Sequence, residues 1–253
     1  AQRRLARIMR IFIHNVDTYL GKVLVDELRK GDGVFHRVFG TAAAGADQAP
    51  KVVKRILSRD DPKKTKKMVD TLQSCKVIVM DLFSSTLEDL HFAIKALKVD
   101  PTASPPKPTG DFENEVTFIL VSSAMVWSHT TVDPDIGSVR ESDFPARAPA
   151  PGSKYERWKE MEDLMMSCFN REGSTVKGLV VAGGVLYGEG EDTLGPLFKD
   201  AWCGVQEHAI LGNGKNRIPT VHVRDLARLV RQVGQNSDGI VAAETPYFLA
   251  VDQ

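Results

Sequence analysis

The sequence predicts an α/β fold of the Rossmann type, with a doubly wound parallel sheet covered by helices on both faces. Short, nearly continuous apolar segments alternate along the chain with segments whose apolar residues recur every three or four positions. The first pattern is typical of strands buried on both faces, and the second is typical of helices that cover a sheet. Four segments in a fixed order, over 8–21, 116–128, 155–159 and 176–230, would place their polar residues where such sheets bind ligands.

The first half of the chain contains four apolar segments separated by helical patterns. The expected elements are strands over 8–14, 34–39, 76–82 and 116–123, and helices over 20–30, 61–74 and 86–97. Gly31 and Gly33 should end the first helix. Residues 40–50, which are small, and residues 100–111, which are rich in proline, are expected to be loops.

The second half begins with a segment that four prolines interrupt, over 129–153. A loop in this position, after the fourth strand, would lie over the ligand crevice as a lid. The remaining elements are expected to be strands over 175–183 and 247–251 and helices over 155–170 and 221–233. A chain of 253 residues is long enough for one large α/β domain, and we expect a single domain over 1–253.

The composition argues against several classes of protein. The chain has 33 basic and 33 acidic residues, so no net charge draws it to nucleic acid or to a membrane. No apolar run approaches the roughly 18 residues of a membrane span, and the basic start lacks the apolar core of a secretory signal. Cys75, Cys168 and Cys203 are far apart in apolar surroundings, and the histidines are dispersed. We therefore expect buried, reduced thiols and no metal site.

The turn after the first strand is the candidate cofactor site. A glycine fingerprint at this place lets backbone amides contact a pyrophosphate at the start of a helix. The spacing GxxGxxG falls on Asn15, Thr18 and Gly21, with Val16 in the same turn. Gly21 would let the helix pack closely on the strand, and asparagine tolerates positive φ. Thr18 places a β-branched side chain where the backbone should approach phosphate, so we expect weakened or absent binding of NAD or NADP.

The end of the second strand lacks the acidic residue that should bind the adenine ribose. Residues 39–41 are Phe, Gly and Thr, and the nearby Arg37 is either a surface residue or a contact for a 2′-phosphate. This position adds to the expectation that the cofactor is absent.

A Ser-Tyr-Lys set is the candidate catalytic site. Ser122 and Ser123 end the fourth strand, and Ser123 should present its hydroxyl at the edge of the sheet, whereas Ser122 is a further candidate for cofactor binding. Tyr155 and Lys159 are four residues apart and therefore lie on one face of a helix. A nearby ammonium group lowers the pKa of a phenol, which would make Tyr155 a general acid and base. A tyrosine and a lysine four residues apart also occur by chance. The stronger argument for a catalytic site is therefore that this pair follows the strand that ends in Ser123.

Two further segments are rich in glycine or in basic residues. Residues 211–216 (LGNGKN) lack the spacer and the hydroxyl residue of a phosphate-binding P-loop, so phosphoryl transfer is not expected. Residues 51–67 hold eight basic residues, together with Asp60 and Asp61. Such a stretch is commonly a solvated loop and helix face, and the alternative is a surface for an acidic partner.

Three strings of the sequence resemble extended short-chain dehydrogenases/reductases, the family of nucleotide-sugar epimerases and dehydratases. They are SSAMVWS, GGVLYGEG and GNGKNRIPTVHVRDLA, together with the acidic and proline-rich stretch ESDFPARAPAPGSKY that ends in Tyr155, and the resemblance covers essentially the whole chain. It implies NAD or NADP as the cofactor and Ser123, Tyr155 and Lys159 as the catalytic triad. It also implies a truncated substrate lobe, because this chain ends where the family continues.

The chain departs from the pattern of that family at several positions. Trp127 stands where the family usually has tyrosine, Ala182 where it has arginine, and Pro219 and Thr220 where it has Asp-Phe. Together with the two absent glycines, these departures imply that turnover is lost.

Residues 116–253 resemble more closely the N-terminal region of the adenylate kinase isoenzyme seven family of motile cilia, in which a degenerate dinucleotide fold precedes a kinase domain. This resemblance implies a cytoplasmic, cytoskeletal location in the axoneme of a cilium or flagellum, with other axonemal proteins as partners. It implies neither nucleic acid nor membrane, and kinase activity would need a domain outside this chain. We expect a non-catalytic scaffold without cofactor. The alternative is an NAD(P)-dependent reductase or epimerase that uses the Ser-Tyr-Lys site.

Overall fold

The structure is a computed structural model. It describes residues 8–31, 35–43, 49–58, 65–98, 115–132, 135, 137–171, 174–190, 193–208, 213–215, 217–236 and 245–252.

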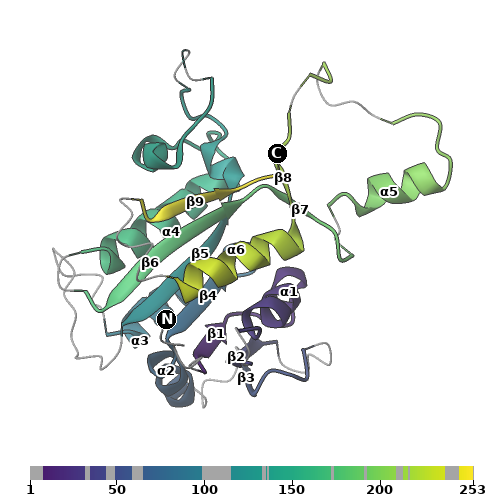
Figure 1. Ribbon diagram of the computed structural model, residues 1–253. Coiled ribbons are helices and arrows are strands. Elements are labelled where there is room, and N and C mark those ends of the chain that lie inside the picture. Colours follow the sequence, from purple (N-terminus) through teal and green to yellow (C-terminus); the bar gives the residue numbers. More distant parts are fainter. Residues whose placement is uncertain are drawn as a thin grey trace, which may run out of the picture.

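Seven parallel strands form the central sheet, in the order β3-β2-β1-β4-β5-β6-β9 (Figure 1). Their bounds are β1 Arg10–Ile13, β2 Arg37–Ala42, β3 Arg55–Ser58, β4 Val77–Asp81, β5 Val116–Ser123, β6 Val176–Gly183 and β9 Tyr247–Ala250. The strand order runs outward from β1 to β3 and then in the opposite direction from β4 to β9. This reversal confirms the doubly wound Rossmann-type fold, whose ligand crevice lies at the carboxyl ends of the strands.

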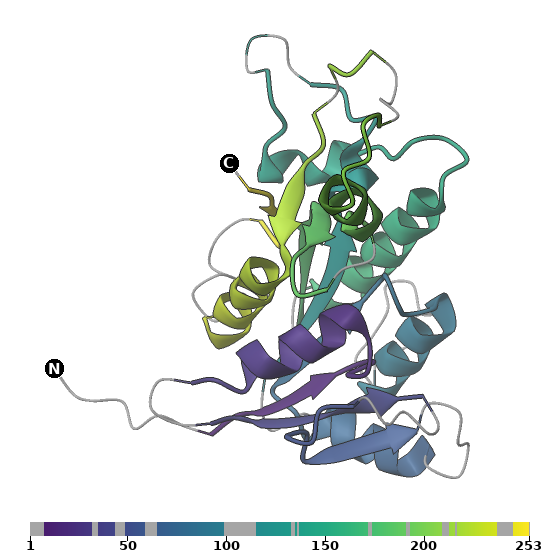
Figure 2. The same cartoon turned by 90° about the vertical axis from the view of Figure 1, so that its right-hand side faces the viewer.

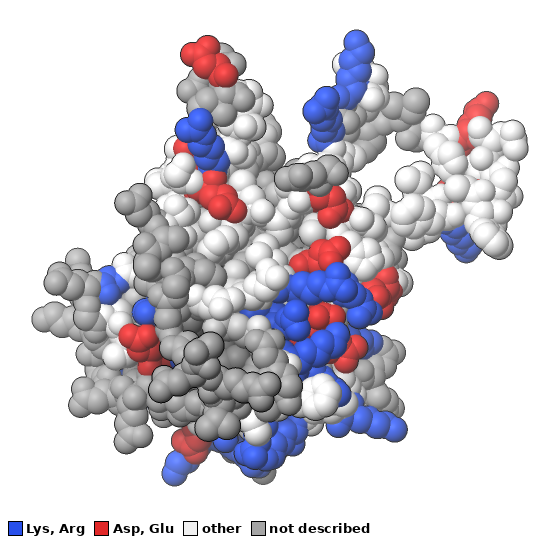
Figure 3. All heavy atoms as spheres, in the orientation of Figure 1, with Lys and Arg blue, Asp and Glu red and all other residues white. Residues whose placement is uncertain are grey.

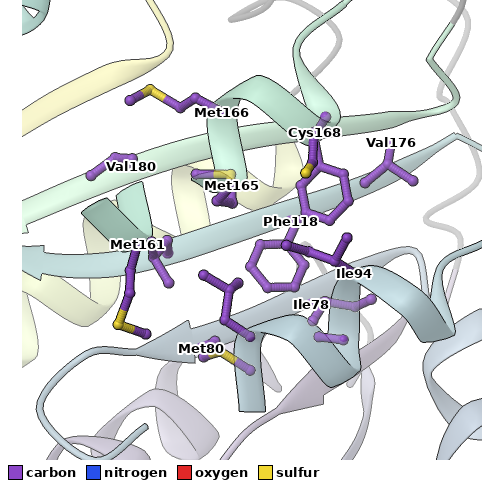
Figure 4. Close-up of a cluster of buried hydrophobic side chains, with 14 of the residues drawn as sticks. Ile78, Met80, Ile94, Phe118, Met161, Met165, Met166, Cys168, Val176 and Val180 are labelled. Atoms are coloured by element: carbon purple, nitrogen blue, oxygen red, sulfur yellow. The ribbon is translucent and has the colours of Figure 1, made fainter. Parts of the chain in front are cut away.

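Helices cover both faces of the sheet (Figures 1 and 2). One face carries α1 Tyr19–Leu28 and α6 Val223–Gln235, and the other carries α2 Thr65–Gln73, α3 Leu87–Ala96 and α4 Lys154–Phe169. Each layer has its own apolar cluster, because side chains of successive strand residues point to opposite faces. Figure 4 shows the α3–α4 side, where methionine and phenylalanine side chains fill the space between helix and sheet, including Met80, Phe118, Met161 and Met165.

A smaller set of elements lies outside these layers. It comprises the parallel pair β7 Val185–Tyr187 and β8 Thr220–His222, the helix α5 Gly195–Trp202, and the 3-10 helices η2 Ala124–Trp127 and η3 Glu141–Ala146. Helix α5 stands away from the sheet and has no buried residue (Figure 1). Within the described residues, no helix is both long and apolar enough to span a membrane.

Most of the expected elements are present, but the second strand lies three residues later than expected. The pattern predicted 34–39, whereas β2 spans Arg37–Ala42 and so takes up the start of the loop expected over 40–50. Gly40 was treated as part of a turn. In the structure it lies inside the strand, where an added Cβ would be 2.4 Å from both the carbonyl oxygen of Ile13 and a methyl group of Val16. Close packing, and not a turn, requires glycine at this position.

Six elements were not predicted: β3, β7, β8, α5, η2 and η3. Strand β3 lies at an edge of the sheet, so part of it is exposed and the continuous apolar pattern is missing. The expectation of three buried thiols was wrong for Cys203, which is exposed at the end of α5. The proline-rich loop over 100–111, residues 61–64 of the expected second helix, and Gly33 lie outside the described residues.

Candidate functional site

The turn between β1 and α1 is held by hydrogen bonds from Asn15. This residue is fully buried and has a φ of 60°, as the fingerprint position requires. Its backbone N–H donates to the Thr41 hydroxyl at 2.8 Å. Its side-chain amide donates to the Ser84 carbonyl at 2.8 Å and to the Ser84 hydroxyl at 2.9 Å. Asn15 thus has the backbone conformation of the missing glycine, while its side chain links the turn to the segment after β4.

Thr18 is the N-cap of α1. Its Oγ1 atom accepts a hydrogen bond from the backbone N–H of Gly21 at 3.1 Å and donates to the carbonyl of Asn15 at 2.9 Å. Gly21 packs as the third glycine of the fingerprint should, because an added Cβ would lie 2.0 Å from the Asn15 oxygen. One of the amide donors at the start of α1 is therefore satisfied by the protein itself.

Two neighbours of Thr18 also make contacts within the protein. The N–H of Val16 donates to the carbonyl of Thr41 at 2.9 Å, and Val16 is fully buried. The hydroxyl of Tyr19, in the first turn of α1, donates to the carbonyl of Gly188 in the segment after β7. This hydrogen bond joins the start of α1 to the β6–β7 side of the molecule. The sequence analysis did not single out Tyr19.

A buried polar cluster lies beside this turn, at the carboxyl ends of β1, β2 and β4. The Nδ1 atom of His14 is 2.9 Å from the Thr41 hydroxyl, and its Nε2 atom is 3.6 Å from a carboxylate oxygen of Asp89. The Asp81 carboxylate accepts hydrogen bonds from the N–H and the hydroxyl of Ser84, at 2.9 and 2.8 Å. Asn15, which is bonded to both Thr41 and Ser84, connects these groups to the turn.

The two carboxylates of this cluster are shifted in opposite directions. Complete burial raises the pKa of Asp81, although hydrogen bonds from Ser84 and the charge of His14 act against that shift. Burial also opposes ionisation of Asp89, but hydrogen bonds from His14 and Thr86 outweigh it and lower the pKa to about 2. Asp89 is thus the more strongly ionised member of the pair.

The Ser-Tyr-Lys residues occupy the expected elements but bond to other partners. Ser123 ends β5, and its Oγ accepts the N–H of Met125 at 3.2 Å as the cap of η2. Tyr155 is half-buried in the first turn of α4, where its ring packs edge-on against Trp158 with a centroid distance of 5.3 Å. The ammonium group of Lys159 donates to Asp163 at 2.8 Å. Among the described residues, no hydrogen bond joins Ser123, Tyr155 and Lys159 to one another.

Burial raises the pKa of the Tyr155 phenol. The sequence analysis expected the opposite, because it assumed that Lys159 would act on this phenol. Lys159 instead forms an ion pair with Asp163 four residues later in the same helix. A phenol with a raised pKa and no cationic hydrogen-bond partner is a poor general base near neutral pH.

Ser122 belongs to a second polar group, which we call the Glu162 network. Glu162, in α4, is fully buried and accepts hydrogen bonds from three directions. The donors are the Ser122 hydroxyl, the Arg147 Nε atom at 2.7 Å, and the Tyr247 hydroxyl at 3.1 and 3.2 Å from the two carboxylate oxygens. Burial raises the pKa of Glu162, and the Arg147 charge together with these hydrogen bonds acts against that shift. The Ser122 hydroxyl therefore bonds to a buried group of the protein interior.

The Glu162 network fixes the segment that was expected to be a lid. Arg147 is 2% exposed, and besides Glu162 it donates to Asp163 at 2.5 Å and to the carbonyl of Phe144 at 2.7 Å. Tyr247, at the start of β9, accepts the indole N–H of Trp127 at 3.0 Å. The buried Arg147–Glu162 ion pair thus binds the segment around η3 to α4, and the Glu141 carboxylate binds it to the Leu249 N–H of β9. Part of this segment is regular 3-10 helix, which the sequence analysis did not expect.

Arg147, Glu162 and Tyr247 were not identified from the sequence. One signal was present: Glu162 lies on the same face of its helix as Trp158, Met165 and Met166, all of which are buried. An acidic residue within an apolar stripe requires a buried partner. The partner itself, Arg147, lies in a proline-rich segment where no periodic pattern marks it.

Comparison with known proteins was made on sequence and on structure. The NAD dependent epimerase/dehydratase family matches residues 111–245. Adenylate kinase 7 of Mus musculus is 27% identical over 185 residues, which are 71% of this chain and 28% of that protein. Adenylate kinase 7 of Macaca fascicularis is 34% identical over 92 residues, 36% of this chain and 16% of that protein. The chain thus spans less than a third of the length of these curated relatives.

Solved structures of the same architecture have low sequence identity to this chain. A human epimerase family protein determined with NADPH has a TM-score of 0.60 and 16% identity, over 96% of this chain and 74% of that chain. The dTDP-glucose 4,6-dehydratase of Bacillus anthracis in complex with NAD has a TM-score of 0.62 and 13% identity, over 96% of this chain and 75% of that chain. At these identities the likeness shows the fold alone.

Proposed function

The chain belongs to the NAD dependent epimerase/dehydratase family, and from this premise we propose that it is a non-catalytic scaffold domain of an axonemal protein in cilia or flagella. In this proposal residues 1–253 form one packing unit without turnover, and its partners are other axonemal proteins. The axonemal setting rests on the similarity to adenylate kinase 7. Phosphoryl transfer is not assigned to this domain.

The observation that carries the proposal is the cap that Thr18 places on α1. A dinucleotide phosphate binds at the start of this helix through backbone N–H groups that no side chain covers. Here the Thr18 hydroxyl accepts a hydrogen bond from the Gly21 N–H at 3.1 Å. The Tyr19 hydroxyl donates a hydrogen bond to the carbonyl of Gly188. The residues present at the turn therefore do not fit a pyrophosphate bound in the manner of a glycine fingerprint.

The bonding of the other polar groups in the crevice supports the same proposal. Ser122 is bonded to Glu162, Ser123 caps η2, and Lys159 is paired with Asp163. An active short-chain reductase needs such groups directed at substrate and cofactor. In this chain they stabilise the protein, and the raised pKa of Tyr155 disfavours proton transfer.

The alternative is an NAD(P)-dependent reductase or epimerase. It is favoured by one observation, that Ser123, Tyr155 and Lys159 all remain at the elements where the family has its catalytic residues. In this alternative, cofactor binding would displace the Thr18 cap and redirect Lys159 from Asp163.

Calorimetric titration with NADH and NADPH separates the two functions. We expect no heat of binding at millimolar cofactor, with an NADPH-binding protein of the same family as the positive control. Micromolar binding to the native protein would contradict the scaffold proposal. In that case, a Tyr155→Phe variant that keeps the cofactor affinity but loses a measured reductase activity would establish the alternative.

A further inference from the structure

The two edges of the central sheet differ in how they are protected. At one edge, η3 lies against β9, and the N–H of Leu249 donates to the Glu141 carboxylate at 2.8 Å. At the other edge, β3 pairs with β2 and, among the described residues, with no other strand. An edge strand presents a row of unpaired backbone N–H and C=O groups, which can bind another extended chain.

The surface at β3 is both basic and partly apolar. Lys51, Lys54 and Arg55 are exposed, and so are the apolar side chains of Val52 and Ile56, which are 50% and 38% exposed. An extended chain that pairs with β3 would contact side chains of both kinds, because successive residues of a strand point to opposite faces.

The basic residues of this edge have no acidic counterparts in the described part of the chain. None of Lys51, Lys54 and Arg55 forms an ion pair there, whereas Arg157 of α4 and Arg224 and Arg228 of α6 do so. The exposed Lys66 and Lys67 of α2 lie at the same end of the sheet (Figures 1 and 2). Figure 3 shows many Lys and Arg side chains on the lower half of this face, with Asp and Glu side chains among them, whereas the protruding α5 is largely uncharged.

The charge of the edge also selects among the chains that could pair with it. Lysine and arginine at an edge strand discourage pairing between two copies, because like charges repel. An acidic extended segment meets no such repulsion and gains both ion pairs and backbone hydrogen bonds.

From this geometry we propose that β3 is a docking site for an acidic, extended peptide segment, which adds to the sheet as an eighth strand next to β3. Backbone hydrogen bonds supply the pairing, Lys51, Lys54 and Arg55 select acidic residues, and Ile56 contacts an apolar residue between them. The site is separate from the cofactor crevice, so it does not depend on whether NAD or NADP binds.

Titration of ¹⁵N-labelled protein with designed peptides tests this site. The probe is a ten-residue peptide in which glutamate alternates with valine. One control has the same sequence with alternate backbone nitrogens methylated, and a second has lysine in place of glutamate. We expect the first peptide to shift the amide signals of β2 and β3 and to slow hydrogen exchange in β3. The methylated and the lysine peptides should bind at least roughly tenfold more weakly, because they lack backbone donors or the matching charge.

A pair of charge-reversal variants completes the test. Lys54→Glu/Arg55→Glu should weaken binding of the acidic peptide by roughly tenfold or more. Lys199→Glu/Lys215→Glu, which makes the same change of charge at exposed positions away from β3, should leave it unchanged. Equal binding of the methylated peptide would reduce the effect to simple ion pairing and overturn the proposal. So would the absence of binding, or an unchanged affinity in a folded Lys54→Glu/Arg55→Glu protein.

Discussion

The β1–α1 turn and the Glu162 network are two polar regions at the carboxyl edge of one sheet, and they are stabilised in different ways. In the turn, the groups that bond to one another are neutral, and the helix is capped locally, because Thr18 bonds to Asn15 and Gly21. In the network, the Arg147–Glu162 ion pair is fully buried. The residues of the network come from separate segments, as Glu162 and Tyr247 do. Both arrangements direct polar groups inward. The comparison shows two ways in which polar groups at this edge bond within the protein, by local capping in the turn and by tertiary pairing in the network.

The largest expected effect comes from breaking the ion pair of the network. Glu162→Ala would leave the Arg147 guanidinium buried without its main partner. Loss of one member of a buried pair costs about 3–5 kcal/mol of unfolding free energy, measurable by urea denaturation. Glu160→Ala, at an exposed position of the same helix, should change stability by no more than about 0.5 kcal/mol.

A double variant sharpens this prediction. Replacing both charges with apolar residues, as in Arg147→Met/Glu162→Leu, removes the unpaired charge as well as the attraction. The double variant should therefore lose less stability than Glu162→Ala. An equal loss of unfolding free energy in the two variants would mean that side-chain packing, and not charge, determines how much the network stabilises the protein.

The second largest effect on stability is expected at the β1–α1 turn, which depends on close packing and not on an ion pair. Gly21→Ala would place a Cβ 2.0 Å from the Asn15 carbonyl oxygen. The helix must shift to relieve this contact, at a cost of about 2–3 kcal/mol. The matched control is Gly195→Ala in α5, where an added Cβ meets nothing within 4 Å. If both variants unfold at the same urea concentration as the native protein, α1 does not pack on the turn as described.

A smaller effect is expected from pH, through Asp89 next to the turn. Its pKa in the folded protein is about 2, below the reference value of 3.8. A lowered pKa of an acid means that the stabilisation is present above about pH 4 and is lost as the pH falls toward 2. Because the side chain is 32% exposed, solvent reduces the contribution to about 1 kcal/mol.

Asparagine substitution isolates this contribution from other titrating groups. Asp89→Asn should lower the unfolding free energy at pH 6 and flatten its decline between pH 4 and pH 2. Asp70→Asn, at an exposed position of α2, should leave the profile unchanged. A decline that is equally steep in Asp89→Asn and in the native protein would exclude Asp89 as its source.

The sequence predicted one of these two regions and missed the other, for physical reasons. The turn was predicted because its constraints are local: a fingerprint fixes which residue takes a φ of 60° and which must be glycine, and these are Asn15 and Gly21. The doubly wound parallel sheet was predicted similarly, from its buried strands. The Glu162 network depends on pairs distant in sequence, such as Ser122 with Glu162, 40 residues apart. Strand β3 was missed because an edge strand is only partly buried.

The smallest change in stability is expected at Thr18, and it bears most directly on function. Thr18→Gly removes the hydroxyl from the Gly21 N–H but keeps an acceptable N-cap, so the loss should be only a few tenths of a kcal/mol. Thr18→Ala, which removes the cap without the compensation of glycine, should cost about 1 kcal/mol. The two variants therefore separate the role of Thr18 in stability from its role in excluding phosphate.

Cofactor titration of these variants decides what the turn excludes. If the Thr18 hydroxyl is the obstacle, Thr18→Gly and Thr18→Ala, which both free the Gly21 N–H, should bind NADPH or NADH measurably, whereas the native protein should not. Continued absence of binding in Thr18→Gly would place the obstacle at the Tyr19–Gly188 hydrogen bond or at the carboxyl end of β2. Binding that is equal in the native protein and in the glycine variant would mean that the cap yields to phosphate, because a hydroxyl–amide bond contributes only about 1 kcal/mol and a ligand can displace it.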